Sequence, residues 1–362
     1  AHFIAHEDVG KVLAQGGTRA TVLLRDGLQV DLRVVAEESF GAALVYFTGS
    51  KAHNIAIRRL AQQRKLKINE YGVFRGEKRL AGATEASVYK ALGLPFIAPE
   101  LREDRGEIAA AAARTLPELL ERADLKGDLH CHTKASDGQN SLEEMVAAAR
   151  AAGLRYLAIT EHSQRLTVAH GLDRKRLQRQ SAQIDKLNAR LRDFHILKGI
   201  EVDILEDGKL DLPDEALSEL DLVVAAIHGH FDLAPEKQTK RLLRAMERPH
   251  FSILAHPTSR LIGAREGCRF DMERVIKAAA ERGCFLELNA QPERLDLNEV
   301  HCQAARAAGV LVAIGSDAHR TADFDFLGYG VGQARRGWLA ADDVLNARPL
   351  SRLLPLLKRT MG

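Results

Sequence analysis

Histidine and carboxylate residues recur in this chain of 362 residues at the points where short apolar runs end. The run at 156–160 leads to His162, and the run at 311–314 leads to Asp317. Imidazole together with carboxylate oxygen suits borderline divalent ions such as Zn²⁺, Mn²⁺ or Fe²⁺, and such ions can activate water against a phosphate ester. The pattern therefore indicates metal-dependent phosphoester hydrolysis. The candidate ligands are His130, His132, Asp137, His162, Glu201, His228, His256, Asp317 and His319.

The spacing of the first two histidines predicts a shared ion. His130 and His132 are two residues apart, so on a strand both side chains point to the same side and one ion can accept both. Cys131 would point to the opposite side, where packing in the wall is favoured over metal binding. Asp128 and Asp203 flank ligands, and each is a candidate either to orient a ligand or to cap a strand or loop.

Composition favours a soluble globular protein over membrane and secreted classes. Hydrophobic residues make up 46% of the chain and charged residues 28%, and no apolar run approaches the roughly 20 residues that span a bilayer. The first residues show no basic segment followed by an apolar one, as a secretory signal requires. The four cysteines lack a Cys-x-x-Cys spacing and are expected to be reduced thiols. We expect a cytoplasmic protein with no membrane partner.

The elements that must position the candidate ligands repeat as strand, polar loop and helix. Amphipathic helices, such as those predicted at 141–152 and 174–192, separate most of the strands. Seven alternating strands predict a closed parallel α/β barrel with its chemistry at the carboxyl ends of the strands, and an open doubly wound sheet is the alternative. The predicted strands are 127–132, 154–160, 195–203, 221–227, 252–256, 284–289 and 311–316.

The front of the chain predicts a smaller α+β arrangement. Two strands within 19–35 are joined across Asp26-Gly27, a hairpin turn signal. The remaining pattern predicts helices at about 37–47, 50–66 and 84–91, and a helical linker at about 107–122.

One segment of the front part is strongly basic. From Lys51 to Lys67 the chain has no acidic residue. A solvated helix face and a contact surface for the phosphate backbone of DNA are both open interpretations. The basic residues are Lys51, Arg58, Arg59, Arg64, Lys65 and Lys67.

The motifs that carry the candidate ligands resemble a known domain. Asp-Leu-His-Cys-His at 128–132, Ala-Ile-Thr-Glu-His-Ser at 158–163, Leu-Ala-His-Pro at 254–257 and Gly-Ser-Asp-Ala-His at 315–319 are similar to successive motifs of the polymerase-and-histidinol-phosphatase (PHP) domain. The resemblance covers 126–362. It implies a distorted (βα)7 TIM-like barrel with two to three divalent ions.

The resemblance also distributes the ligands among three ions. His130, His132, Glu201 and Asp317 would hold the first ion and form the catalytic group. Asp137, His162 and His319 would hold the second. His228 and His256 would hold the third, with Glu201 as a bridge. The family pattern favours His228 over His230, which is then a substrate contact or a surface residue.

The front part resembles another family. Tyr-Phe-Thr-Gly-Ser-Lys-Ala-His-Asn at 46–54 and Lys-Ile-Asn-Glu-Tyr at 67–71 are similar to the thumb of family X DNA polymerases, and Val-Asp-Leu-Arg at 30–33 is similar to their palm strand. The whole chain resembles the C-terminal part of a bacterial or archaeal family X polymerase with a fused PHP domain. The implied domains are the palm end at 1–48, the thumb at 49–105, a linker at 106–125 and the PHP domain at 126–362.

This second resemblance implies roles that belong to a longer polymerase. Asp31 would bind the palm Mg²⁺ ions, and the incoming nucleotide would contact Tyr46, Phe47, Gly49 and Asn54. Nucleotidyl transfer needs metals held by three carboxylates, and no Asp-x-Asp pair precedes Asp31. Polymerisation is therefore not expected from this chain.

The residues and both resemblances together predict a metal-dependent phosphodiesterase acting on DNA 3′ ends in repair. The expected activity is a 3′–5′ exonuclease on gapped or recessed DNA, with 3′-phosphatase or abasic-site processing as further options. Arg260 and Arg294 lie just beyond barrel strands, and each is a candidate either for a phosphate ligand or for an ordinary surface ion pair. A small-molecule phosphatase similar to histidinol phosphatase and a metal-stabilised scaffold are the alternatives. We expect a monomer.

Overall fold

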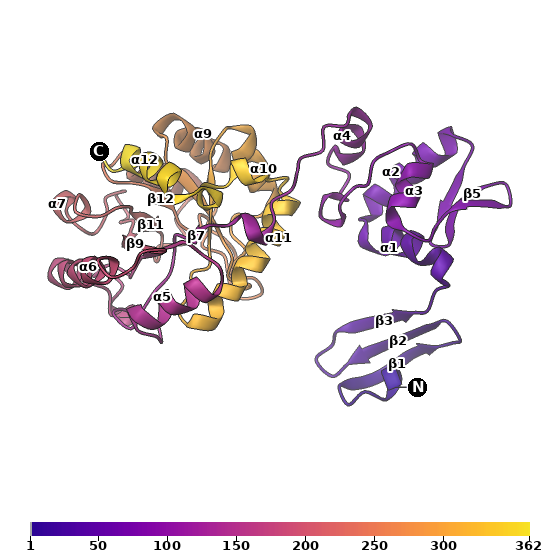
Figure 1. Cartoon of the computed structure of the whole chain (residues 1–362), viewed down its shortest axis with the longest axis horizontal. Helices are drawn as coiled ribbons and strands as arrows, with labels where there is room; N and C mark the ends of the chain where they lie inside the picture. Colours follow the sequence, from indigo (N-terminus) through magenta and orange to yellow (C-terminus); the bar gives the residue numbers. More distant parts are fainter. Residues whose placement is uncertain (1) are drawn as a thin grey trace. The chain divides into compact units, whose positions relative to one another are not determined.

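The computed structural model describes residues 2–362, and the chain divides into two compact units (Figure 1). The first unit ends at Leu116 and the second runs from Pro117 to Gly362. The division falls within the linker that the sequence predicts. Within 2–362 no helix is both long enough and apolar enough to cross a membrane.

The first unit begins with a three-stranded antiparallel sheet of β1 (Val9–Gln15), β2 (Arg19–Leu24) and β3 (Gln29–Arg33). The hairpin predicted across Asp26-Gly27 is present, because the Asp26 carboxylate accepts the Leu28 N–H at 2.9 Å and Gly27 has a φ of +92°. The sequence analysis missed β1, whose residues are mostly exposed and whose pairing contains two register shifts. An exposed, irregular edge strand lacks the alternation that identifies strands.

The rest of the first unit packs short helices on a second small sheet. The helices are α1 (Phe40–Thr48), α2 (Lys51–Gln63), α3 (Glu85–Ala91) and α4 (Glu107–Ala113), and the sheet contains β4 (Lys67–Asn69), β5 (Gly72–Arg75) and β6 (Lys78–Ala81). The predicted linker helix is shorter than expected because Arg114 adopts a left-handed backbone and Pro117 follows, which disfavours the helical conformation at the residue before it.

Buried polar groups hold this unit together. His53 lies between Glu107, with Nδ1 2.5 Å from Oε1, and the hydroxyl of Tyr89, 3.0 Å from Nε2. Arg102 is fully buried and its guanidinium donates to Glu85 at 2.7 Å and to the carbonyl of Ile97. Such charges remain buried because each has partners.

The second unit is a closed parallel barrel. Its strands are β7 (Gly127–Asp128), β8 (Tyr156–Ile159), β9 (His195–Lys198), β10 (Glu201–Asp203), β11 (Val224–Ala226), β12 (Ile253–Leu254), β13 (Phe285–Asn289) and β14 (Val312–Gly315). They form the sheets β7-β8-β9 and β10-β11-β12-β13-β14. Bridges at His162–Glu201 and Cys131–Ala318 join the two sheets. With β9 and β10 as one interrupted strand, the predicted seven-stranded barrel is confirmed.

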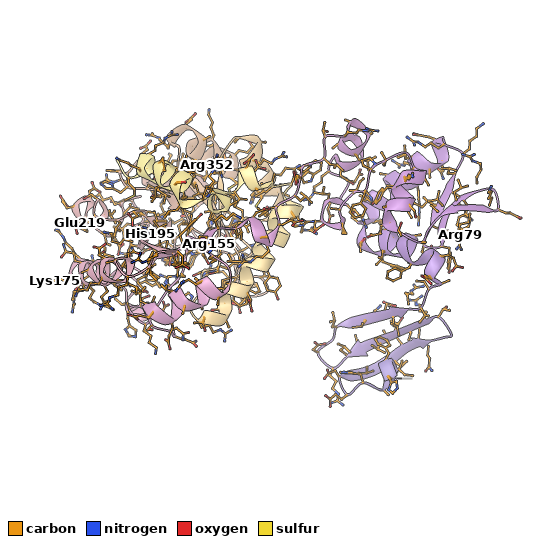
Figure 2. The ribbon with its side chains drawn as sticks, in the orientation of Figure 1. Arg79, Arg155, Lys175, His195, Glu219 and Arg352 are labelled. Carbon is orange, nitrogen blue, oxygen red and sulfur yellow. The ribbon has the colours of Figure 1, made fainter. Side chains whose placement is uncertain are left out.

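Helices surround the strands. They are α5 (Leu142–Ala151), α6 (Arg174–Asn188), α7 (Asp214–Leu217), α8 (Pro235–Met246), α9 (Met272–Arg282), α10 (Glu299–Ala307), α11 (Leu327–Arg336) and α12 (Leu350–Thr360). Charged side chains such as Lys175 on α6 and Glu219 beyond α7 lie at the outer surface (Figure 2).

Alternate residues along the barrel strands belong to two different hydrophobic cores. On β8, Leu157 and Ile159 pack outward in the core shared with the helices, whereas Tyr156 and Ala158 belong to a second core inside the barrel. Leu357 of α12 belongs to that inner core as well. The positions that face into the barrel continue beyond the ends of the strands, and the polar residues gather there.

Candidate metal centre

The candidate ligands come from the carboxyl ends of most barrel strands. Glu201 opens β10 and is inward, while His162 and Asp317 follow β8 and β14 closely. The backbone redirects two of them, because His256 has a φ of +25° and Asp317 a φ of +52°. Non-glycine residues in this region are strained and concentrate at functional sites. All nine predicted ligands are brought into one cluster, in which six are buried, His228 and His319 are half-buried and Asp137 is exposed.

The first group of ligand atoms surrounds Asp317. Its Oδ1 lies 3.2 Å from Nε2 of His132 and 3.6 Å from Nε2 of His130. The three ligand atoms of this group lie within 4.8 Å of one another. Glu201 Oε2 is 3.5 Å from the same His130 nitrogen. These are the four residues that the family resemblance assigns to the first ion.

The second group surrounds Asp137. Its Oδ1 lies 3.5 Å from Nε2 of His319, and its Oδ2 lies 3.5 Å from Nε2 of His162. His132 joins this group, with Nδ1 3.9 Å from Asp137. The resemblance did not assign His132 here, so one imidazole borders two groups.

The third group surrounds Glu201. Its Oε1 lies 2.9 Å from Nε2 of His256 and 3.2 Å from Nε2 of His228, and its Oε2 lies 2.7 Å from Nδ1 of His162. Glu201 therefore contacts members of all three groups, as a bridging carboxylate would. His162 borders both the second and the third group, which the resemblance did not imply.

Several of these ligand atoms are buried without a hydrogen-bond partner in the part of the chain that the structure describes. Buried polar atoms are normally paired, because an unpaired one carries the full cost of desolvation. Divalent ions would satisfy those atoms that act as ligands, and nine candidate ligands exceed the four of one tetrahedral site. The clearest cases are His130 Nε2, His132 Nδ1, His228 Nδ1 and His256 Nδ1, whereas His162 Nδ1 and Glu201 Oε2 lie 2.7 Å apart as an ion pair.

The charges within the cluster shift the pKa values of its own carboxylates and imidazoles. Burial alone would raise the pKa of Glu201, but the imidazoles of His162, His228 and His130 hold that pKa well below its ordinary value. Burial also opposes protonation of His162, yet Glu201 and Asp137 raise its pKa to about 10. Burial, helped by two neighbouring imidazoles, lowers the pKa of His132 to about 3. The carboxylate of Glu201 is therefore ionised and the imidazole of His132 is neutral.

Glu287 is a site residue that the sequence analysis missed. It is buried on β13, and its Oε1 lies 2.7 Å from Nδ1 of His130, while its Oε2 accepts the N–H of His256 at 2.7 Å. Gly315 makes room for it, because a Cβ there would lie 2.4 Å from the Glu287 Oε1. A carboxylate that orients a metal-binding histidine is common next to metal sites. The available signal was a single acidic residue at an inward position of an apolar strand.

The other acidic neighbours stabilise the strand ends. Asp128 accepts the N–H groups of His130 and Ser316 at 3.1 and 3.2 Å, so it holds two ligand-bearing segments through their backbones. Asp203 accepts the N–H of His228 at 3.2 Å and lies 3.6 Å from its Nδ1.

The two candidate arginines differ in their surroundings. Arg260 donates Nε to the carbonyl of Arg294 at 2.7 Å and a second nitrogen to the carbonyl of Leu295, so much of its guanidinium is used by a loop. Arg294 lies 3.8 Å from Asp317, and its Nη1 is buried without a hydrogen-bond partner among residues 2–362. Arg294 lines a cavity of about 450 Å³ together with Asp317 and His319. His230 is half-exposed and lies 4.0 Å from Glu206.

Family models match both units. The DNA polymerase beta thumb matches residues 43–103 and the PHP domain matches residues 128–291. The chain is 43% identical over 356 residues, 97% of its length, to the DNA polymerase/3′-5′ exonuclease PolX of Bacillus subtilis. The chain therefore contains a DNA polymerase beta thumb followed by a PHP domain, as expected for the C-terminal part of a family X DNA polymerase with a fused PHP domain. It spans 62% of the length of that relative.

Further similarities are to phosphatases. A probable phosphatase of Thermoanaerobacter sp. is 30% identical over 230 residues, which cover 60% of this chain and 89% of the relative. A solved structure of histidinol phosphate phosphatase from Lactococcus lactis is 16% identical, with a TM-score of 0.43, and covers 59% of this chain and 93% of its own.

The polymerase-type residues of the first unit have local partners. Asp31 accepts Thr21 Oγ1 at 2.6 Å, and this hydrogen bond is the main cause that lowers its pKa. Asn54 donates Nδ2 to the carbonyls of Tyr46 and Gly49, both at 2.9 Å, which fixes the corner between α1 and α2. Phe47 is half-exposed and packs edge-on to Tyr46 at 4.9 Å.

The basic residues of the thumb are exposed. Arg58 and Arg59 lie on α2, and the Arg58 guanidinium lies 5.4 Å from the centre of the Tyr46 ring. Arg64 follows the end of α2 and lies against Gly93. The helix ends at Gln63, earlier than predicted, because Lys65 adopts a left-handed backbone with a φ of +57°.

Proposed function

We propose that the barrel of this chain hydrolyses phosphodiesters at DNA 3′ ends with the help of two or three divalent ions. The observation that carries the proposal is the convergence of five imidazole rings on the buried carboxylate of Glu201, at distances of 2.7 to 3.6 Å. Borderline ions such as Mn²⁺, Zn²⁺ or Fe²⁺ suit this mixture of nitrogen and oxygen ligands. His130, His132, Glu201 and Asp317 would hold the catalytic ion.

The bound ions would supply Lewis-acid stabilisation of the phosphoryl group and lower the pKa of a water. The protein residues supply orientation. Glu287 fixes the ring of His130, and Asp203 fixes the backbone of His228. Arg294, with a buried unpartnered Nη1 beside Asp317, would hold a phosphate oxygen in the adjoining cavity. No protein nucleophile is required.

Features of the first unit favour DNA as the substrate. The thumb family match and the exposed arginines of α2 favour binding of the phosphate backbone. The PolX relative carries a 3′-5′ exonuclease in its name. We extend that activity to gapped or recessed 3′ ends in repair, and place a monomeric enzyme in the cytoplasm. Asp31, Tyr46, Phe47, Gly49 and Asn54 would serve Mg²⁺ and nucleotide in a polymerase that is longer than this chain.

A small-molecule phosphomonoesterase is the second candidate, because the barrel is also 30% identical to a probable phosphatase. The deciding experiment incubates the purified chain with Mn²⁺ and a 5′-labelled duplex with a recessed 3′ end, and separately with histidinol phosphate. We expect stepwise shortening of the DNA strand from its 3′ end. Phosphate release from histidinol phosphate without DNA shortening would establish the second candidate.

A further inference from the structure

The first unit carries a groove that the barrel chemistry leaves unexplained. It lies between the end of α3 and α4 and has a volume of about 710 Å³. Its floor is apolar, with Leu94, Pro95 and Ala112 among the lining residues, and Phe96 also lines it. All of these residues belong to the first unit.

The charged residues of the groove are all cationic. Lys90 and Arg114 line it, and no acidic side chain does. Arg64 adds a third cation at the rim, because a Cβ on the lining residue Gly93 would lie 2.0 Å from the Arg64 Nη1. None of these three cations forms an ion pair within residues 2–362. The groove therefore offers positive charge that the chain itself does not neutralise.

The aromatic ring in the groove is held in place while it stays accessible. Phe96 is 45% exposed. The ring of Tyr89 packs against it edge-on, with centroids 6.1 Å apart, and the buried guanidinium of Arg102 lies 5.6 Å from its centre. Arg102 is itself fixed by Glu85. A fixed, half-exposed ring is a surface on which a planar ligand can stack at low entropic cost.

We propose that this groove binds an unpaired segment of DNA, with a base stacked on Phe96 and phosphates held by Lys90, Arg114 and Arg64. Single-stranded nucleic acids are bound by basic grooves that carry aromatic side chains for base stacking. An apolar peptide would leave three cations without counter-charge. A duplex would keep its bases from the ring. The inference stands whether or not the barrel hydrolyses DNA.

The test measures binding by the full chain in the presence of a chelator, so that no cleavage occurs. The probes are a fluorescent oligothymidylate and a strand of equal length that contains only abasic sites. We expect oligothymidylate to bind more tightly. Phe96→Leu keeps apolar bulk but removes the aromatic face, and should weaken oligothymidylate binding about tenfold without changing abasic-strand binding. Phe96→Tyr should bind as the unaltered chain does, which separates stacking from folding.

The charge variants test the phosphate contacts. For a single strand each neutralised phosphate contributes about 0.7 to the slope of log affinity against log salt concentration. Lys90→Ala/Arg114→Ala should therefore flatten the slope by about 1.4. Arg75→Ala/Lys78→Ala removes two exposed charges from the β5–β6 turn of the same unit and should leave the slope unchanged.

Three results would overturn the proposal. The first is equal loss of binding in the control charge variant. The second is unchanged oligothymidylate affinity in Phe96→Leu. The third is an unchanged affinity of the groove variants for oligothymidylate together with a change in their sedimentation coefficient. That result would mean that the groove binds a second copy of the chain.

Discussion

The Nδ1 atom of His130 lies 2.7 Å from Oε1 of Glu287, and both side chains are buried at the barrel rim. With Nδ1 occupied, His130 presents Nε2 to Asp317 and Glu201 at 3.6 and 3.5 Å. The second oxygen of Glu287 accepts the His256 N–H. One carboxylate therefore positions two candidate ligands.

Glu287→Gln should reduce metal affinity about 10- to 100-fold, because it keeps the side-chain volume but removes the charge that orients His130. Affinity is measured by competition with a chelating dye. The melting temperature in excess chelator is the control, since it reports loss of fold without metal. An unchanged affinity in a stable variant would leave Glu287 with a purely structural role.

Metal binding should release protons. In the metal-free protein the carboxylates of Glu201 and Asp137 raise the pKa of His162 to about 10, and Asp137 and Asp317 raise that of His319 to about 9, in each case against the effect of burial. Both rings are therefore protonated at pH 7.5 and must lose a proton to bind an ion. The carboxylates of Glu287, Asp317 and Glu201 also raise the pKa of His130 against the effect of burial. We therefore expect release of at least two protons per chain in calorimetric titrations run in buffers of different ionisation enthalpy, and weaker affinity as pH falls.

The same two pKa values predict how the metal-free chain responds to pH. A histidine whose pKa is raised in the folded state stabilises the fold fully below its unfolded pKa of about 6.5, and this contribution is lost as pH rises through the folded value. Metal-free protein should therefore lose stability toward pH 9–10. In the metal-loaded protein, His162 and His319 should not contribute to the dependence of stability on pH. Zero proton release on loading would contradict both expectations.

Metal stoichiometry should respond differently to two substitutions. Fully loaded protein should contain more than one ion per chain by elemental analysis. Asp137→Ala should remove the ion of the second group only, because it contacts His162 and His319. Glu201→Ala should reduce loading further, because Glu201 borders all three groups. Equal stoichiometry in both variants would refute the bridging position of Glu201.

Arg58→Ala/Arg59→Ala should weaken binding to duplex DNA of any sequence. Each lost phosphate contact lowers the salt slope by about 0.9 for a duplex, so a change of up to about 1.8 is expected. Hydrolysis of a small chromogenic phosphodiester should be unchanged. A duplex affinity and salt slope that match those of the unaltered chain would mean that α2 is simply a solvated helix face.

Asn54→Ala should destabilise the chain by about 1–3 kcal/mol, because carbonyls at the α1–α2 corner lose their donor. The measurement is chemical unfolding followed by circular dichroism. Gln62→Ala, at an exposed position of the same helix, is the matched control and should have almost no effect. Comparable stability of the two variants would show that the corner does not depend on Asn54.

The sequence predicted which side chains come together at the barrel rim, while their roles as metal ligands stay a prediction. Apolar runs that end in His162 or Asp317 predict a strand-end ligand, because the carboxyl ends of parallel strands meet at one rim. The sharing of His132 and His162 between groups was missed, since it depends on ring orientations that spacing does not encode. Arg260 and Arg294 look alike in sequence, and only the structure shows that Arg260 is used by loop carbonyls.

Short elements with little burial were the main omission in the fold. The strands β4, β5 and β6 have three or four residues each and few buried positions, so they lack a clear alternation. Glu287 was missed for the opposite reason, because a buried carboxylate inside an apolar strand has no periodic signature.

The barrel closes through the segments that carry the candidate ligands, and this determines when the cluster can form during synthesis. Asp128 accepts the N–H of Ser316, 188 positions further along the chain, and Cys131 pairs with Ala318. The ribosome must therefore release the last strand before His130 can meet Asp317. A nascent chain that lacks this strand would leave His130 and His132 without Asp317, so the full set of candidate ligands assembles only after translation of the barrel is complete.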